Sequence, residues 1–151
     1  MDFIADLHPK IVHFPIALFF TSVLFDAIGF IFKKESYQKS AHLLLFLGVL
    51  GAFAAAFSGN QAFNAYKFWN TYSLTALADH ELYANITVWY FSIILILRTY
   101  LVLKKRYFSK IKYLVFILSL LGCLLVFQTS EYGGKLIREF GIGTEFELNH
   151  K

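Results

Sequence analysis

Cysteine, proline and charged residues are all scarce in this sequence of 151 residues. The single cysteine, Cys123, lies inside an apolar run and has no partner, which excludes a disulfide framework and a thiolate metal site. Only 16% of the residues are charged, whereas 58% are hydrophobic and 19% aromatic, a balance that ordinary soluble domains do not have. Lipid must therefore be the solvent for most of the chain. A chain this short then has no room for a separate soluble catalytic domain.

The basic residues lie in short polar breaks rather than in one stripe. The sequence carries 14 Lys and Arg against 10 Asp and Glu, which gives a net charge of +4. The members of the two breaks are Lys33, Lys34 and Lys39, and then Lys104, Lys105, Arg106, Lys110 and Lys112. This distribution is typical of loops that stay in the cytoplasm, and it argues against nucleic-acid binding. The first residues lack the basic segment of a secretory signal, so the apolar run that follows is expected to be retained.

Four apolar stretches predict an all-α, integral membrane four-helix bundle that forms a single domain over residues 1–151. They cover residues 11–32, 42–58, 82–103 and 111–127, and each is near the length that crosses a hydrocarbon core of about 30 Å. With both basic breaks in the cytoplasm, the two termini, the segment 59–81 and the tail 128–151 are predicted on the outer, periplasmic side. The expected location is the plasma (inner) membrane of a bacterium.

Aromatic residues mark both predicted membrane interfaces, where amphipathic rings are favoured. Those on the outer side are Tyr66, Phe68, Trp69, Tyr72 and Tyr83, and those on the inner side are Tyr37, Tyr100, Tyr107 and Tyr113. A short helix on the outer membrane surface is also predicted, because one helical face would carry Ala62, Phe63, Tyr66 and Trp69. The tail after residue 127 holds too few apolar residues for a core of its own and predicts an outer loop.

Small residues recur every four positions in the second apolar stretch. They are Gly48, Ala52 and Ala56, and also Gly51, Ala55 and Gly59. Small residues at this spacing let another helix, or a flat cofactor, come very close. Helix packing is the simpler interpretation, and a cofactor slot is the functional one. The sequence shows no internal repeat.

Two charged residues fall inside apolar stretches, where an unpaired charge is strongly unfavourable. Asp26 lies seven residues before Lys33, and Arg98 lies six before Lys104. Because both stretches run from outside to inside, the two side chains reach matching depths, roughly 10 Å above the inner surface. We therefore predict a structural ion pair between Asp26 and Arg98. A proton-relay role for Asp26 is the alternative.

Three of the five histidines fall on the outer side of the predicted bundle. His8 and His13 lie at the start of the first apolar stretch, and His80 lies at the start of the third. His42 is at the cytoplasmic end and His150 is in the tail, so neither is expected to join them. In one unbroken helix His8 and His13 would point about 140° apart and could not easily bind one metal from the same face. One ligand from each of two helices is easier.

Both prolines lie beside these histidines. Pro9 is expected at the first helical position, with His8 near the N-cap. Pro15 falls inside the helix, where its missing N–H frees the Ile11 carbonyl and bends the chain beside His13.

Two neutral imidazoles on facing helices are the donor set of b-type haem. His13 and His80 are the first choice for this pair, with His8 in reserve. His13 stands 13 residues above Asp26, whereas His80 stands 18 above Arg98, a depth mismatch of about 7 Å that helix tilt or a bend could remove. His8 matches the depth of His80 better. Outer-side cations that could bind the propionates are Lys10, Lys67, Lys135 and Arg138. The alternative is that these histidines are hydrogen-bonded anchors at helix ends.

Several segments resemble a family of small bacterial predicted membrane proteins with four helices, an HPxxVHFP-type start and no settled function. They are LHPKIVHFPIAL (7–18), LFD (24–26), GGKLI (133–137) and GIG (141–143). The resemblance spans nearly the whole chain and implies a four-helix inner-membrane protein. It directs attention to His8, His13, Asp26 and His80. The relatives are similar to small membrane b-type cytochromes, which implies a respiratory role.

The leading hypothesis is a membrane haem b protein that transfers electrons near the periplasmic face, between quinol and a periplasmic carrier. A non-catalytic accessory subunit of a larger membrane complex, or a homo-oligomer, is the alternative from another class. A third hypothesis is a periplasmic-side copper or zinc site formed by His8, His13 and His80. Whether the protein is an enzyme stays open. A channel is disfavoured because no stretch shows a long polar stripe.

Overall fold

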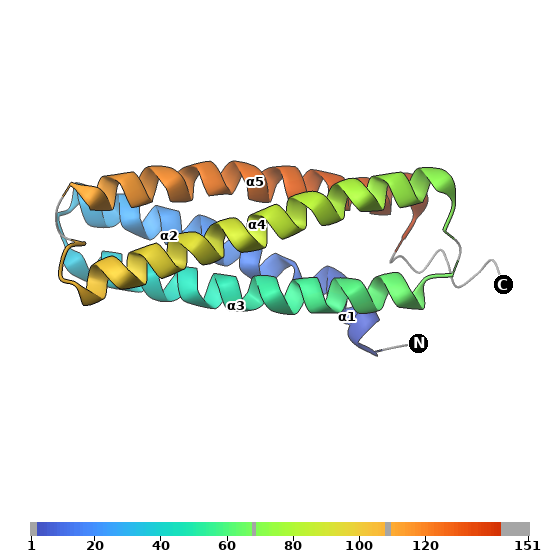
Figure 1. The fold of residues 1–151 in the computed structure, drawn as a ribbon, viewed down its shortest axis with the longest axis horizontal. Helices are drawn as coiled ribbons and strands as arrows, with labels where there is room; N and C mark the ends of the chain where they lie inside the picture. Colours follow the sequence, from blue (N-terminus) through green and yellow to red (C-terminus); the bar gives the residue numbers. More distant parts are fainter. Residues whose placement is uncertain (1–2, 68, 108–109, 143–151) are drawn as a thin grey trace.

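The computed structural model describes residues 3–67, 69–107 and 110–142, and every regular element within these ranges is a helix. The helices are α1 (Phe3–Ile11), α2 (His13–Ile31), α3 (Glu35–Ala65), α4 (Thr71–Leu103) and α5 (Ile111–Phe140). Since α1 and α2 follow one another almost directly, the chain forms four rods that are long and apolar enough to cross a membrane. The rods lie side by side (Figure 1). The prediction of an all-helical chain with four membrane-spanning lengths is confirmed.

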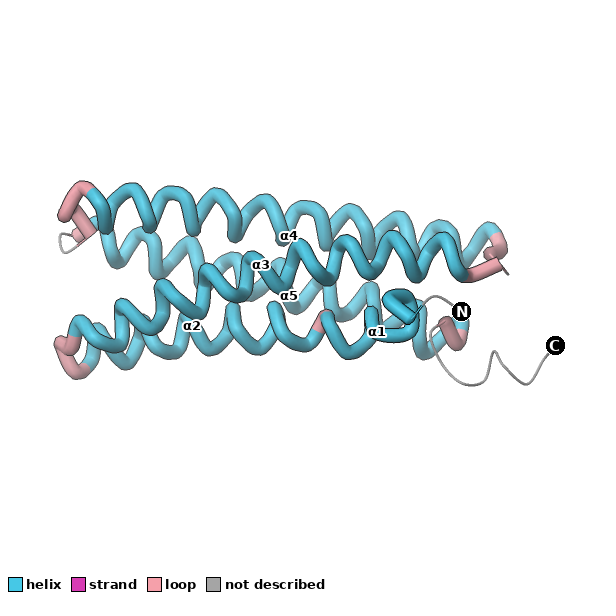
Figure 2. The backbone as a smooth tube through the Cα atoms, turned by 90° about the horizontal axis from the view of Figure 1, so that it is seen from below, coloured by secondary structure: helices cyan, strands magenta, loops and turns pink. Residues whose placement is uncertain are grey.

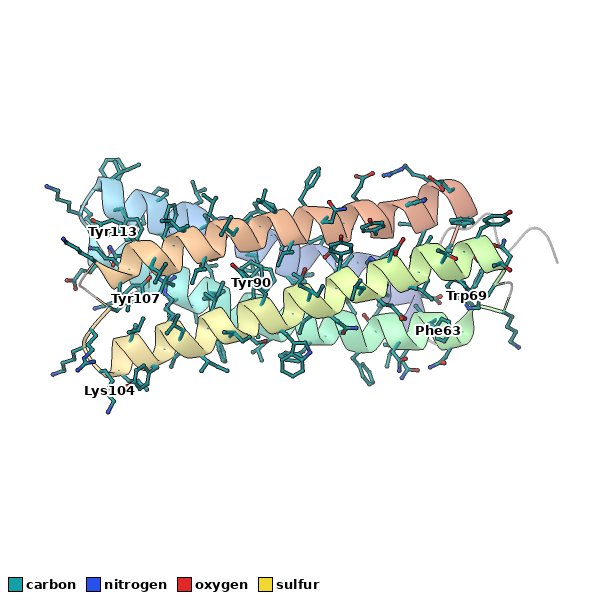
Figure 3. All side chains as sticks on the ribbon, turned by 45° about the horizontal axis from the view of Figure 1, so that its top comes forward. Phe63, Trp69, Tyr90, Lys104, Tyr107 and Tyr113 are labelled. Atoms are coloured by element: carbon teal, nitrogen blue, oxygen red, sulfur yellow. The ribbon has the colours of Figure 1, made fainter. Side chains whose placement is uncertain are left out.

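The two ends of the bundle differ in charge. The α2–α3 and α4–α5 connections lie at one end, which we call the basic end because it carries Lys33, Lys34, Lys104 and Lys105. The start of α1, the α3–α4 connection and the end of α5 lie at the opposite end, called here the terminal end (Figure 1). Figure 3 shows Tyr107 near the basic end and Trp69 near the terminal end.

The helices extend further than the apolar stretches that predicted them. α3 continues on both sides of residues 42–58, and α5 runs through most of the tail that was predicted as a loop. Helix α5 ends only where Gly141 takes a left-handed conformation, with φ of 66°. Polar residues at these helix ends do not stop the helix, because its backbone hydrogen bonds continue regardless of side-chain polarity. Residues 143–151, including His150, lie outside the described residues.

The predicted surface helix after the second span does not form. α3 itself carries Ala62 and Phe63 and ends at Ala65, after which the chain turns directly into α4. The Trp69 ring folds back on this turn and donates from Nε1 to the Phe63 carbonyl oxygen at 3.3 Å. Asn70 then starts α4 with a reciprocal capping box to Ser73, which leaves no residues for a separate element. Phe68 lies outside the described residues.

The first rod is broken at Val12 (Figure 2). Pro15 is the third residue of α2, and because proline has no N–H the Ile11 carbonyl has no donor there. The bend predicted near Pro15 therefore falls at Val12. Pro9 was predicted at the first helical position, but α1 begins at Phe3 and Pro9 lies inside it. The prediction was wrong because the helix starts upstream of the apolar stretch that was predicted to begin at residue 11.

Several polar side chains are buried inside the bundle, whereas many large apolar side chains face outward. Ser22, Asp26 and Arg98 are at most 2% exposed, whereas the apolar side chains of Ile93 and Ile96 are 64% and 69% exposed. Such a surface suits lipid. Because lipid tails are as apolar as Leu and Ile side chains, these residues gain little from being buried inside the protein. Association of the rods therefore depends on close packing and buried polar contacts.

Positions 72 residues apart meet at the centre of the bundle. The rings of Phe19 in α2 and Phe91 in α4 stack with centroids 3.8 Å apart and planes 7° apart. Seven residues further along each helix, Asp26 contacts Arg98, again across a separation of 72 residues. Contacts between equivalent positions are those expected around an approximate two-fold axis that relates the α2–α3 hairpin to the α4–α5 hairpin.

Glycines on α3 and α5, the second helices of the two hairpins, follow the same two-fold relation. A Cβ on Gly48 of α3 would lie 2.8 Å from the Phe19 ring, and a Cβ on Gly122 of α5 would lie 2.6 Å from the Phe91 ring. Each hairpin thus holds its central phenylalanine against a glycine of its own second helix. The two halves of the chain place contacting residues at the same spacing but differ in most of the amino acids around them. The sequence itself therefore shows no internal repeat.

Candidate functional site

His80 lies in α4 near the terminal end and is half-buried. Its Nδ1 lies 3.1 Å from the backbone carbonyl oxygen of Thr129 in α5. Since a carbonyl oxygen can only accept, Nδ1 carries the proton and donates it. The lone pair of the neutral ring is therefore on Nε2, the atom through which such a histidine binds a metal or haem iron.

His8 of α1 has the same arrangement against α3. Its Nδ1 lies 2.9 Å from the Ser58 hydroxyl oxygen, and that hydroxyl donates its own hydrogen to the Ala55 carbonyl at 3.0 Å. The Ser58 oxygen must then accept from Nδ1, which again leaves the lone pair on Nε2. Among the residues that the structure describes, neither His8 nor His80 makes a hydrogen bond through Nε2.

The two imidazoles occupy equivalent places in the two-fold arrangement. A Cβ on Gly59 of α3 would lie 3.0 Å from Cε1 of His8, and a Cβ on Gly133 of α5 would lie 3.0 Å from Cε1 of His80. Like the central phenylalanines, the histidines are 72 residues apart, and each lies against a glycine of a neighbouring helix. His80 is also close enough to act electrostatically on His8. We treat the two imidazoles as one candidate site, which we call the histidine pair.

The structure does not bring His13 into this site. His13 is exposed, and its Nδ1 lies 2.7 Å from the Pro9 carbonyl oxygen in the preceding turn. The reserve choice, His8, instead accompanies His80, because His8 and His13 point in different directions and the helix break lies between them. Within the described ranges no group of three or more His, Cys, Asp or Glu side chains could hold a metal ion, so the three-histidine copper or zinc site is not formed there.

The predicted partners of the propionates lie on the surface. Lys10 and Lys67 are exposed. Arg138 already forms an ion pair with Glu131, with a distance of 2.6 Å, and Lys135 lies 3.9 Å from Glu139. An anionic ligand would therefore have to compete with carboxylates for Arg138 and Lys135.

The glycines and alanines of the second span do not form one continuous slot. The space at Gly48 is filled by the Phe19 ring, and the space at Gly51 by Pro15. Only Gly59 faces a histidine. The small residues therefore serve mainly the packing of the first rod on α3, which is the simpler of the two interpretations.

The structure brings Asp26 and Arg98 together in the other half of the bundle. Arg98 donates from Nη1 to Asp26 Oδ2 at 2.6 Å and from Nη2 to Asp26 Oδ1 at 2.8 Å. Both side chains are 1% exposed. Arg98 Nη2 also donates to the Gln38 carbonyl oxygen at 2.7 Å, so the planar guanidinium ties α2, α3 and α4 together.

Tyr107 was predicted as an aromatic anchor in the inner interface, but the structure turns it inward. It is 2% exposed, and Cζ of Arg98 lies 4.8 Å from its ring centroid. Burial raises the pKa of the Tyr107 phenol, so the hydroxyl stays protonated and can donate a hydrogen bond. A cation on its ring face favours this inward position over the lipid interface.

Sequence reasoning missed Ser58, Thr129 and Gly133 beside the histidine pair, and it missed Gln38 and Tyr107 beside Arg98. The separation of 72 residues between His8 and His80 was a signal for the first three, because Asp26 and Arg98 have the same separation and were already paired. Nothing in the sequence distinguishes Tyr107 from the other tyrosines near the basic breaks.

Comparison with known proteins identifies a family for this chain but no activity. The model of one family, described as "Predicted membrane protein (DUF2231)", matches residues 5–145. No curated protein matches the sequence, and no solved structure matches it. The family description agrees with the four membrane-length rods, and the chain is a multi-pass membrane protein.

Proposed function

Because the chain belongs to the DUF2231 family of predicted membrane proteins, and its histidine pair joins two rods at one end of the bundle, we propose that it binds haem b and transfers single electrons near the periplasmic face. The observation that carries this proposal is the histidine pair itself. Two neutral imidazoles, at equivalent positions, each have Nδ1 held by the protein, and neither makes a hydrogen bond through Nε2 to a described residue.

The donor set is that of a bis-imidazole haem. His8 and His80 would hold the haem iron, and the haem would supply the one-electron redox chemistry. Ser58 and the Thr129 carbonyl orient the rings by accepting from Nδ1, which also makes each imidazole a stronger donor. Gly59 and Gly133 provide room beside Cε1 that any side chain would fill. Quinol and a periplasmic carrier are the proposed electron donor and acceptor.

The test is an absorption spectrum of the purified full chain after expression with ample haem. We expect a Soret band and, after dithionite reduction, the sharp α band of a low-spin b-type haem. His8→Ala and His80→Ala should each remove the low-spin spectrum, because each deletes one axial ligand. His13→Ala is the matched control and should leave it unchanged. A chain without a Soret band, even after reconstitution with haem, would refute the proposal.

The same two imidazoles could instead hold a copper or zinc ion, and metal analysis of the same preparation distinguishes that outcome. An accessory subunit is the alternative with its own observation. α4 exposes an apolar patch that includes Ile93, Ile96 and Tyr100, which a partner helix would cover on this alternative. If the chain is an accessory subunit, His8→Ala and His80→Ala change its stability or assembly and leave its visible absorption spectrum unchanged.

The proposed orientation places the basic end in the cytoplasm and both termini in the periplasm. The test uses a Cys123→Ala background with a new cysteine at Lys104 or Asn64, which are exposed at the basic end and near the terminal end. In intact cells treated with a membrane-impermeant maleimide, we expect labelling at position 64. Position 104 should react only after the cells are opened. The reverse pattern would contradict the orientation.

A further inference from the structure

A second polar cluster lies near the basic end of the bundle, away from the histidine pair. Four of its side-chain atoms are buried and have no hydrogen-bond partner among the described residues: Gln38 Oε1, His42 Nδ1, Arg98 Nε and Tyr107 OH. An unpaired buried polar group costs about 1–3 kcal/mol. Four of them in one place do not make a stable dry arrangement.

The other residues that carry these atoms are linked to the Arg98 guanidinium by a backbone hydrogen bond, a ring contact or its charge. Nη1 donates to Asp26 and Nη2 donates to Asp26 and to the Gln38 carbonyl, whereas Nε makes no hydrogen bond among the described residues. The Tyr107 ring lies over the guanidinium, with its centroid 4.8 Å from Cζ. His42 follows Gln38 by one turn of α3 and is close enough to respond to the charge of Arg98.

The four atoms offer both donors and acceptors. Arg98 Nε can only donate and Gln38 Oε1 can only accept, whereas His42 Nδ1 and the Tyr107 hydroxyl can do either. A water molecule both donates and accepts, and a buried water makes about three hydrogen bonds to groups that otherwise lack partners. We infer that the structure holds one or two ordered water molecules between Arg98, Gln38, His42 and Tyr107.

This water completes the shell around the buried ion pair. It supplies hydrogen bonds that Asp26 does not provide, and so lowers the desolvation cost of keeping Arg98 charged inside the bundle. Tyr107 covers one face of the guanidinium, with its ring centroid 4.8 Å from Cζ, and is itself 2% exposed. The proposed water therefore lies among buried side chains.

X-ray hydroxyl-radical footprinting of the full chain in lipid nanodiscs tests this inference. Radicals form at bound water itself, so a buried ring beside water is oxidised despite its low exposure. Tyr107 should be oxidised severalfold faster than Phe91, which is 0% exposed and lies in the apolar centre, after correction for the intrinsic reactivity of the two rings. Equal corrected rates would overturn the inference.

A variant links the oxidation to the proposed water. Gln38→Leu removes the Oε1 acceptor and puts an apolar group beside the proposed water, so the Tyr107 rate should fall toward that of Phe91, while an unchanged Phe91 rate reports an intact bundle. If this variant does not fold, Tyr107→Phe with His42 as the oxidised reporter makes the same measurement. Undiminished oxidation in the folded variant would show that no water is held there. Neither readout depends on whether haem binds.

Discussion

Arg98→Ala is expected to lower the free energy of unfolding by about 3–5 kcal/mol, the usual cost of removing one partner of a buried ion pair. The carboxylate of Asp26 would be left at 1% exposure with no cation beside it. The substitution also removes the link from α4 to the Gln38 carbonyl of α3. Titration of the purified protein from mild detergent into SDS, followed by circular dichroism, measures the loss.

Ile93→Ala is the matched control, because it truncates a side chain of the same helix that is 64% exposed to lipid. It should change the unfolding free energy by much less. The double variant Asp26→Leu with Arg98→Leu should recover most of the loss, since replacing both charges leaves none unpaired. If Arg98→Ala behaves like Ile93→Ala, the pair contributes nothing to stability.

The ion pair also determines which hairpins associate. Asp26 and Arg98 occupy equivalent positions in the two hairpins, so the contact at this depth joins unlike charges only when the α2–α3 hairpin meets the α4–α5 hairpin. Two copies of the same hairpin would place like charges against each other in a low-dielectric interior, which costs several kcal/mol. The charges thus favour pairing of the two unlike hairpins of one chain over pairing of two identical hairpins.

The depth of a residue in the membrane was predictable from the sequence, whereas the direction of its side chain around the helix axis was not. The basic breaks gave a common reference level, and residues counted from it placed Asp26 beside Arg98 and His8 level with His80. The choice between His8 and His13 depended on where the first helix breaks. That break at Val12 arises from a proline three residues later and from the packing of α1 on α3, and no count of apolar residues reports either.

The residues that contact the histidines were harder to predict than the histidines themselves. Ser58 and Thr129 act through one hydroxyl and one carbonyl oxygen, groups that occur throughout the chain. Gly133 was read as part of a loop, because the tail lacks the apolar pattern of a helix. Its role became visible only when α5 was found to continue past residue 127 and bring it to His80.

Gly122→Ala is expected to lower the unfolding free energy by about 1–3 kcal/mol, as overpacking of a well-packed core does. The new Cβ would lie 2.6 Å from Cζ of Phe91 and 2.9 Å from Cε1 of Tyr90. Neither ring can move easily, because Phe91 stacks on Phe19 and the Tyr90 hydroxyl donates to the Leu118 carbonyl at 2.9 Å. SDS titration against the unaltered protein measures the effect.

Gly134→Ala is the decisive comparison, since it makes the same change in the same helix. Its Cβ would approach Arg138 Nη1 to 2.7 Å, a contact nearly as short as that at Gly122. The Arg138 side chain is 60% exposed and can swing aside, so this variant should be neutral or gain up to about 1 kcal/mol from the better helix propensity of alanine. Because the contact distances are similar, only the freedom of the neighbour to move can separate the two outcomes. Equal losses at both positions would mean that the fixed Phe91 and Tyr90 rings are not the cause of the loss at Gly122.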